Sequence, residues 1–129
     1  MRLSKPVRWI LYTVGGLFAG TNTGTITVSN SVFEGNSVVN SGGSEYFGDG
    51  GGAMIYNDST AQIYVTGNTF TSNSASGGDN PDGGGLMTYQ LGAGAFVSID
   101  DNTFSGNSAG LNGGGCIIRI NHSGEIQFT

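Results

Sequence analysis

Apolar and polar residues alternate along four short segments of the chain: Thr25-Ile26-Thr27-Val28, Gln62-Ile63-Tyr64-Val65, Phe96-Val97-Ser98-Ile99 and Glu125-Ile126-Gln127-Phe128. Such alternation is typical of a β-strand that buries one face and exposes the other. When the segments are aligned, their apolar residues form two columns, which we expect to face inward: Ile26, Ile63, Val97 and Ile126 in one, and Val28, Val65, Ile99 and Phe128 in the other. The residue between them, such as Tyr64, is expected to face outward.

A Phe-x-x-Asn motif follows the first three of these strands at a constant distance. It occurs as Phe33 with Asn36, Phe70 with Asn73, and Phe104 with Asn107, so its copies recur at a nearly constant period. Such recurrence indicates a repeat architecture, in which each unit buries its apolar face against the next. We expect the phenylalanines to stack inside and the asparagines to form a ladder at the following bend.

Two kinds of corner are expected in each repeat. The pairs Ser29-Asn30, Thr66-Gly67 and Asp100-Asp101 follow the alternating strands and contain residues that tolerate a left-handed backbone. A triple glycine forms the other corner, where a positive φ and a close approach of neighbouring repeats both favour glycine. The triples include Gly51 and Gly52, Gly84 and Gly85, and Gly114 and Gly115.

A further strand follows each triple glycine, and its inward face is ambiguous because apolar residues occupy alternate positions on both faces. The strands begin Ala53-Met54, Leu86-Met87 and Cys116-Ile117, and Gly15-Gly16-Leu17-Phe18 is a degenerate copy of the same signal. The favoured assignment places Ala53, Leu86 and Cys116 inside, together with Ile55, Thr88 and Ile118.

These signals predict an all-β, right-handed single-stranded parallel β-helix of the pectin-lyase-like kind, with three to four coils. Each repeat is expected to supply three strands, two tight corners and one loop. The repeats are placed at about residues 14–49, 50–82 and 83–112, with a partial repeat at 113–129, and residues 1–13 are interpreted as an N-terminal cap, an upstream coil or a signal-like segment.

One loop in each repeat changes in length. It runs from the asparagine of the motif to the first glycine of the triple, and it becomes shorter in each successive repeat: Asn36 to Gly50, Asn73 to Gly83 and Asn107 to Gly113. A loop that shortens while everything else keeps its register is expected to project from the stack. The displayed loops are therefore expected at residues 37–49, 76–82 and 110–112.

The charge distribution disfavours one class of partner. Of the 129 residues only four are basic, and Arg2, Lys5 and Arg8 stand at the start, which leaves Arg119 against all nine acids from residue 14 onward. An acidic body disfavours nucleic acid, because binding to phosphates depends on lysine and arginine.

The two motifs together carry a family resemblance. The segments Asn68-Thr69-Phe70-Thr71-Ser72-Asn73-Ser74-Ala75 and Asn102-Thr103-Phe104-Ser105-Gly106-Asn107-Ser108-Ala109, combined with the Gly-Gly-apolar-apolar signal, resemble the repeats of polymorphic outer membrane proteins, the autotransporter-like surface adhesins of chlamydiae. The resemblance implies a secreted or outer-membrane β-helical passenger that is not an enzyme and that binds a protein or glycan on a host or neighbouring cell. Membrane association would then come only through other parts of a larger protein.

Two other functions stay open. A β-helical enzyme acting on polysaccharides, a lyase or a glycoside hydrolase, would need paired acids, and Asp100 with Asp101 or Asp79 with Asp82 are the candidates. Because adjacent residues of a strand point to opposite faces, Asp100 and Asp101 are poor partners, and no catalytic residue is assigned. The third alternative is a truncated repeat fragment without an independent function.

Two candidate sites follow from the columns. Asp49, Asp82 and Asn112 each precede a triple glycine, so their oxygen atoms are candidate ligands for Ca²⁺, the only cofactor considered; the competing interpretation is that they are ordinary turn residues. Tyr56, Tyr89 and Arg119 align as an outward column that can bind a sugar ring or a protein, or that simply stabilises the wall by stacking.

Overall fold

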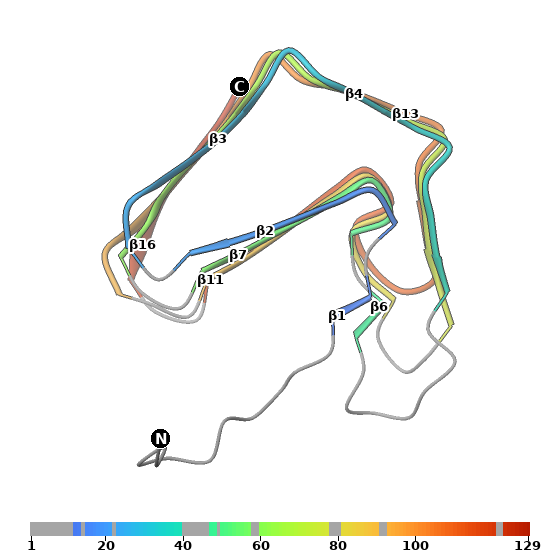
Figure 1. Cartoon of the computed structure of the whole chain (residues 1–129), viewed down its shortest axis with the longest axis horizontal. Coiled ribbons are helices and arrows are strands. Elements are labelled where there is room, and N and C mark those ends of the chain that lie inside the picture. The colour runs from blue at the N-terminus through green and yellow to red at the C-terminus, as the bar shows by residue number, and fades with distance from the viewer. Residues whose placement is uncertain are drawn as a thin grey trace, which may run out of the picture.

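The chain folds into β-strands that pair in parallel, each with the equivalent strand of the next repeat. The structure, a computed structural model, describes residues 12–13, 15–21, 23–39, 47–48, 50–57, 60–77, 81–90, 93–120 and 123–129. Within these residues there is no helix, and the strands of successive repeats lie over one another in Figure 1. This all-β stack of parallel strands is compatible with a parallel β-helix.

Two four-stranded sheets, two three-stranded sheets and one two-stranded pair account for the described strands. In pairing order, the first four-stranded sheet contains β15 (Cys116–Ile120), β11 (Leu86–Gln90), β7 (Ala53–Asn57) and β2 (Leu17–Thr21), and the second contains β16 (Gly124–Phe128), β12 (Ala95–Asp100), β8 (Gln62–Thr66) and β3 (Thr25–Ser29). One three-stranded sheet contains β13 (Thr103–Ser105), β9 (Thr69–Thr71) and β4 (Val32–Glu34), and the other contains β14 (Ser108–Ala109), β10 (Ser74–Ser76) and β5 (Ser37–Val39). The two-stranded pair consists of β1 (Tyr12–Thr13) and β6 (Phe47–Gly48). We call the two four-stranded sheets, in this order, the β7 sheet and the β8 sheet.

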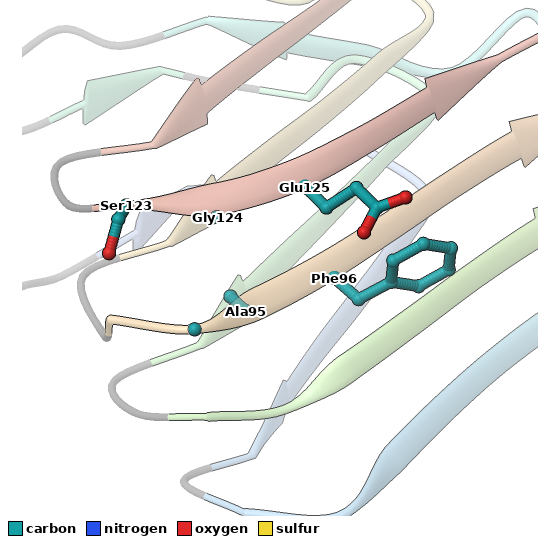
Figure 2. Close-up of a pocket in the computed structure, with 6 residues that line it drawn as sticks. Ala95, Phe96, Ser123, Gly124 and Glu125 are labelled. Carbon is teal, nitrogen blue, oxygen red and sulfur yellow. The ribbon is translucent and has the colours of Figure 1, made fainter.

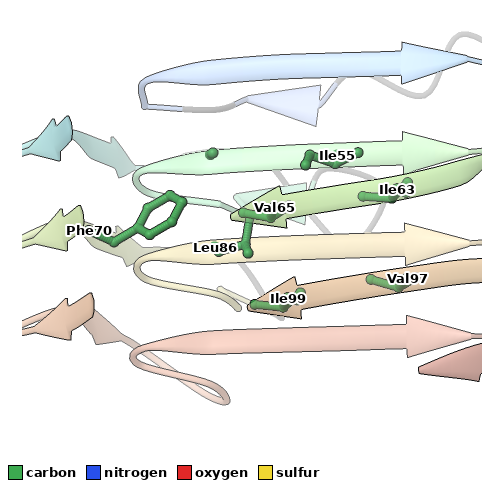
Figure 3. Close-up of a cluster of buried hydrophobic side chains, with 8 residues drawn as sticks. Ile55, Ile63, Val65, Phe70, Leu86, Val97 and Ile99 are labelled. Carbon is green, nitrogen blue, oxygen red and sulfur yellow. The ribbon is translucent and has the colours of Figure 1, made fainter. Parts of the chain in front are cut away.

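The core lies between the inward faces of the β7 sheet and the β8 sheet. The register pairs Ile26 with Ile63, Ile63 with Val97 and Val97 with Ile126, which confirms the alignment of the first column, and the second column aligns in the same way. On the last strand, Ile126 and Phe128 are 48% and 57% exposed. The favoured assignment for the other sheet is also confirmed, because the fully buried cluster in Figure 3 contains Ala53, Ile55 and Leu86 together with Ile63, Val65, Phe70, Val97 and Ile99.

The phenylalanine stack and the asparagine ladder are both confirmed. The ring centroids of Phe33 and Phe70 lie 4.8 Å apart and those of Phe70 and Phe104 lie 5.0 Å apart, each pair with planes 6° from parallel. The side-chain oxygen of Asn73 accepts hydrogen bonds from the backbone N–H and the side-chain amide of Asn36, both at 3.0 Å. Asn107 repeats this arrangement on Asn73, so each amide satisfies polar groups of the preceding repeat.

A second ladder runs beside the first, and it was not predicted from the motifs. The side-chain oxygen of Asn102 accepts from the backbone N–H and the side-chain amide of Asn68, both at 2.9 Å, and Asn68 in turn accepts from the backbone N–H of Ser31 at 3.0 Å. The amide of Asn68 also donates to the carbonyl of Val28 at 2.9 Å. The repeats are thus joined by two columns of amides rather than one.

Among the described residues, each of the first three repeats contributes one strand to each of four sheets and has a left-handed residue at three equivalent corners, so the expectation of three strands and two corners was wrong. The Phe-x-x-Asn motif divides into two short strands, as in β9 and β10, because the residue before its asparagine has a positive φ. Three sets of equivalent left-handed residues recur: Asn30, Gly67 and Asp101; Gly35, Ser72 and Gly106; and Gly50, Gly83 and Gly113. Gly24, Gly77 and Gly94 also have a positive φ. The first and third sets are the predicted corners.

The second and third glycines of a triple are required for close approach. An added Cβ at Gly84 would collide with the carbonyl oxygen of Ser108, and one at Gly51 would lie 2.5 Å from that of Ser74. Gly52 and Gly85 pass against the side chains of Asn73 and Asn107, which a Cβ would also crowd. At Gly114 and Gly115 the nearest atoms are more distant, at 3.1 and 3.5 Å.

The ends of the variable loop also differ from the expectation. Ser37–Val39 and Ser76 belong to β5 and β10 in the wall, and Phe47–Gly48 forms β6, which pairs with β1 one repeat earlier. Residues 40–46, 49 and 78–80 lie outside the described residues, as do residues 1–11 of the proposed cap or signal-like segment.

Candidate functional site

Asp82 and Asn112, two members of the candidate calcium column, lie one repeat apart as their positions before the triple glycines indicated. They form a parallel bridge, and the backbone N–H of Asn112 donates to the Oδ1 of Asp82 at 3.0 Å. The third member, Asp49, lies outside the described residues. The backbone carbonyl of Asp82 accepts from the N–H of Gly50 at 3.0 Å, so the column is integrated into the stack.

Arg119 joins the two candidate sites that the sequence analysis kept apart. Its guanidinium forms an ion pair with the carboxylate of Asp82, whose side chain is fully buried, while that of Arg119 is 33% exposed. The carboxylate that was proposed as a calcium ligand is therefore already neutralised by a cation of the chain. Among the described residues no group of three or more His, Cys, Asp or Glu side chains is placed to share a metal ion, and the calcium site stays a prediction.

Tyr56, Tyr89 and Arg119 align in register on β7, β11 and β15. The two tyrosine rings lie 5.9 Å apart, with planes inclined by 42°, and both side chains are half-buried. Binding at this column stays a prediction. Stacking across the strands is the contribution that the ring distance supports directly.

The outward face of the β7 sheet is covered at Met54 and Met87, which was not predicted from the sequence. Met54 and Met87 point away from the core cluster, yet their exposed fractions are 0% and 1%. The first glycine of each triple lies against them: an added Cβ on Gly50 or Gly83 would be 2.8 Å from the Cβ of the methionine. The connection before each strand therefore folds back over the outward side of that strand.

The outward face of the β8 sheet carries a second aromatic pair. The rings of Tyr64 on β8 and Phe96 on β12 lie 5.6 Å apart and are inclined by 48°. Beside Phe96 is an open hollow of about 380 Å³, lined by Gly94, Ala95, Phe96, Ser123, Gly124 and Glu125. Figure 2 shows Phe96 and Glu125 projecting from neighbouring strands on the same side of the sheet. In the sequence, the signal for this site was Phe96, an aromatic residue at an outward position. Only the cross-strand register shows that Phe96 lies beside Glu125.

Asp100, one of the candidate acids for polysaccharide cleavage, lies on this face at the end of β12. Hydrogen bonds from the hydroxyl groups of Ser98 and then Thr129 lower the pKa of Asp100 below its ordinary value. A general acid in a glycosidase needs a raised pKa, so this environment suits a permanent anion better than a proton donor. Asp101 occupies the adjacent left-handed corner at φ 55°, and Asp79 lies outside the described residues.

Cys116 lies on β15 at the position of Ala53 and Leu86 and packs against the core. Burial raises the pKa of its thiol to about 12. Since the thiolate is the reactive form, this cysteine acts as a small apolar residue.

Comparisons with known proteins return no family model, no curated protein and no solved structure that matches this chain. The resemblance to polymorphic outer membrane proteins thus remains a prediction based on the motifs alone. No helix in the described part of the chain is long and apolar enough to cross a membrane.

Proposed function

We propose that this chain is a right-handed parallel β-helix module of a secreted or outer-membrane adhesin, which binds a protein or glycan on another cell and catalyses no reaction. The observation that supports this proposal most is the place where the repeats differ. A module that displays binding loops needs a constant frame and a variable segment attached to one point of it.

Most connections between strands have nearly constant length. Two residues separate β3 from β4, β8 from β9 and β12 from β13, and two residues again separate β4 from β5, β9 from β10 and β13 from β14. The connections from the β7 sheet to the β8 sheet contain three or four residues.

The connection that leads into the β7 sheet behaves differently. It occupies positions 40–52 between β5 and β7, positions 77–85 between β10 and β11, and positions 110–115 between β14 and β15, so it shortens at each repeat. The strands on either side nevertheless keep their register. Large changes in length are therefore confined to one connection of the repeat.

Several polar side chains of the repeat are used for architecture, which favours binding over catalysis. The amides of Asn68, Asn73, Asn102 and Asn107 hold the stack together, and Asp82 is committed to Arg119. The resemblance of the motifs to surface adhesins supplies the proposed location and the proposed class of partner.

A cell-binding assay tests the proposal. The labelled chain is added to cultured epithelial cells and to bacterial cells, and saturable binding is measured by flow cytometry. Deletion of residues 40–46 makes the first connection as short as the third, which occupies positions 110–115. We expect the parent chain to bind and the deletion variant to lose binding while it keeps the same circular dichroism spectrum.

A variant in which residues 40–46 are replaced by an equally long segment of glycine and serine separates loop length from loop chemistry. It is expected to fold and to bind as poorly as the deletion. Absence of saturable binding to any of the cells would contradict the adhesin proposal, and cleavage of polygalacturonate by the parent chain would favour the enzyme alternative instead.

A further inference from the structure

The outward face of the β8 sheet combines an aromatic surface with negative charge. Phe96 lies between the ring of Tyr64, 5.6 Å away on one side, and Glu125, its register partner on β16, on the other. Neighbouring strands are about 4.8 Å apart, so the carboxylate of Glu125 can reach the edge of the Phe96 ring. Figure 2 shows both side chains beside the hollow that Ser123, Gly124 and Ala95 line.

This hollow can admit a side chain from another molecule. Three of its six lining residues are Gly94, Ala95 and Gly124, which leave room beside the Phe96 ring, and its volume is about 380 Å³. It is open to solvent, and Glu125 is exposed. A ligand group that enters it meets the ring of Phe96 and the carboxylate of Glu125 together.

No cation of the described residues is available to this surface. Arg119 is the single basic residue among them; it projects from the β7 sheet and pairs with Asp82. Asp100 lies on the same outward face of β12 as Phe96, and two hydroxyl groups hold it in its charged form. The face therefore attracts positive charge and repels an acidic partner.

We propose that the hollow between Phe96 and Glu125 binds an arginine or lysine side chain from a basic segment of the partner protein. An aromatic ring attracts a cation through its quadrupole, and a planar guanidinium can stack on the ring while it donates to the carboxylate. The inference rests on the proposed binding function and specifies the chemistry of the partner: a basic peptide segment rather than a glycan.

The position of Asp100 sets the spacing of a second cation. Asp100 follows Phe96 by four positions on the same strand, a distance of about 13 Å at about 3.3 Å per residue. An extended peptide with two basic residues four positions apart spans the same distance. The peptide that fits this face best has the pattern Arg-x-x-x-Arg and runs along β12.

Titration by nuclear magnetic resonance, which detects weak binding, tests the proposal. The isotope-labelled full chain is titrated at low salt with the capped peptide Arg-Gly-Gly-Gly-Arg, and the backbone signals of residues 94–96 and 123–125 are expected to shift. Because exposed ion pairs and exposed cation–π contacts are each weak, Glu125→Gln should raise the Kd about 5-fold and Phe96→Leu about 3-fold.

Glu34→Gln is the matched control, because Glu34 is an exposed acid on β4 and its loss changes the net charge by the same amount. Its Kd should equal that of the parent chain. Equal weakening by Glu34→Gln and Glu125→Gln would show non-specific attraction and overturn the proposal. Shifts of the same signals by maltohexaose but not by the peptide would also overturn it, in favour of a glycan site. Cell binding that persists when the peptide fails to bind would refute this inference and leave the adhesin proposal standing.

Discussion

The two large sheets of the molecule have equivalent inward faces but different outward faces. Inside, both contribute fully buried apolar residues to one core, such as Ile55 from the β7 sheet and Ile63 from the β8 sheet. Outside, Met54 and Met87 of the β7 sheet are buried under the preceding connection. On the central strands of the β8 sheet, the outward rings of Tyr64 and Phe96 are half-buried and Gln62 is exposed. Ser98 beside these rings is buried. The same strand geometry thus gives one sheet whose central strands bury large apolar side chains on the outward face and one whose central strands leave outward aromatic rings partly open to solvent.

The hydrophobic pattern of the strands in each sheet reflects this difference. Strands buried on both faces are expected to be apolar at consecutive positions, whereas strands with one solvated face alternate. Ala53-Met54-Ile55 and Cys116-Ile117-Ile118 are of the first kind, and Gln62-Ile63-Tyr64-Val65 is of the second. The apolar outward positions that made the β7 sheet ambiguous in the sequence were therefore the signal that its outward face is covered.

The largest effect on stability is expected at the buried charge on the covered side of the β7 sheet. Arg119→Met removes the ion-pair partner of Asp82, whose side chain is fully buried and keeps the N–H of Asn112. Loss of one member of a buried ion pair lowers the free energy of unfolding by about 3–5 kcal/mol. Because Arg119 is partly exposed, we expect a loss of about 3 kcal/mol. Urea unfolding of the two proteins measures the difference.

The double variant Asp82→Ala with Arg119→Met is the control for that measurement. It removes both charges and is expected to recover at least half of the lost stability, because no unpaired charge remains. If Arg119→Met alone were as stable as the parent chain, water would have to reach Asp82. The connection before β11 would then not cover the outward side of the β7 sheet.

The stacking of the repeats could be predicted from the sequence because it depends on period alone. The inward columns, the phenylalanine stack and the Asn36–Asn73–Asn107 ladder all follow from one alignment of motifs. The second ladder was not predicted because Ser31 lies in the first repeat where Asn68 and Asn102 lie in the next two. Comparison of two repeats instead of three would have revealed it.

The ion pair could not be predicted from the sequence. Asp82 and Arg119 are separated by about one repeat along the chain, but they belong to different parts of the unit. Their contact depends on how the connection before β11 folds back over the sheet, and no periodic signal encodes that path. The left-handed corner at Gly35, Ser72 and Gly106 was missed for a different reason, since Ser72 replaces glycine in the middle repeat.

Truncation of outward side chains on the two sheets gives the next largest difference. Met87→Ala on the covered face should cost about 2–4 kcal/mol, because it opens a cavity among buried atoms. Phe96→Ala on the other sheet should cost about 1 kcal/mol, since its half-buried ring loses mainly the contact with Tyr64. Equal costs in denaturant unfolding would remove the distinction between the two faces.

A smaller effect of opposite sign is expected inside the β7 sheet. Thr88 is fully buried between Ile55 and Ile118 in register, and its hydroxyl has no hydrogen-bond partner among the described residues. Thr88→Val keeps the shape and removes the unsatisfied group, so it should stabilise the chain by about 1 kcal/mol. The midpoint of thermal unfolding should rise; a fall would indicate that the hydroxyl has a partner in the folded chain.

The smallest effect concerns Asp100, a partly exposed acid on the open outward face of the β8 sheet. Hydrogen bonds from Ser98 and Thr129 lower its pKa below the ordinary 3.8, so the folded state binds its proton less readily than the unfolded state. The contribution of ionised Asp100 to the free energy of unfolding is therefore fully present above its pKa in the unfolded state. It is lost as the pH falls through the lower pKa of Asp100 in the folded state. Ser98→Ala removes the larger of the two causes, and the carboxyl signal of Asp100 should then titrate closer to 3.8 in a nuclear magnetic resonance experiment.

The difference in thermal midpoint between the parent chain and Ser98→Ala should be greatest near neutral pH and should shrink in acid. A difference that stays constant across this range would mean that Ser98 acts through packing alone, and that the charge on the open face contributes nothing to the fold.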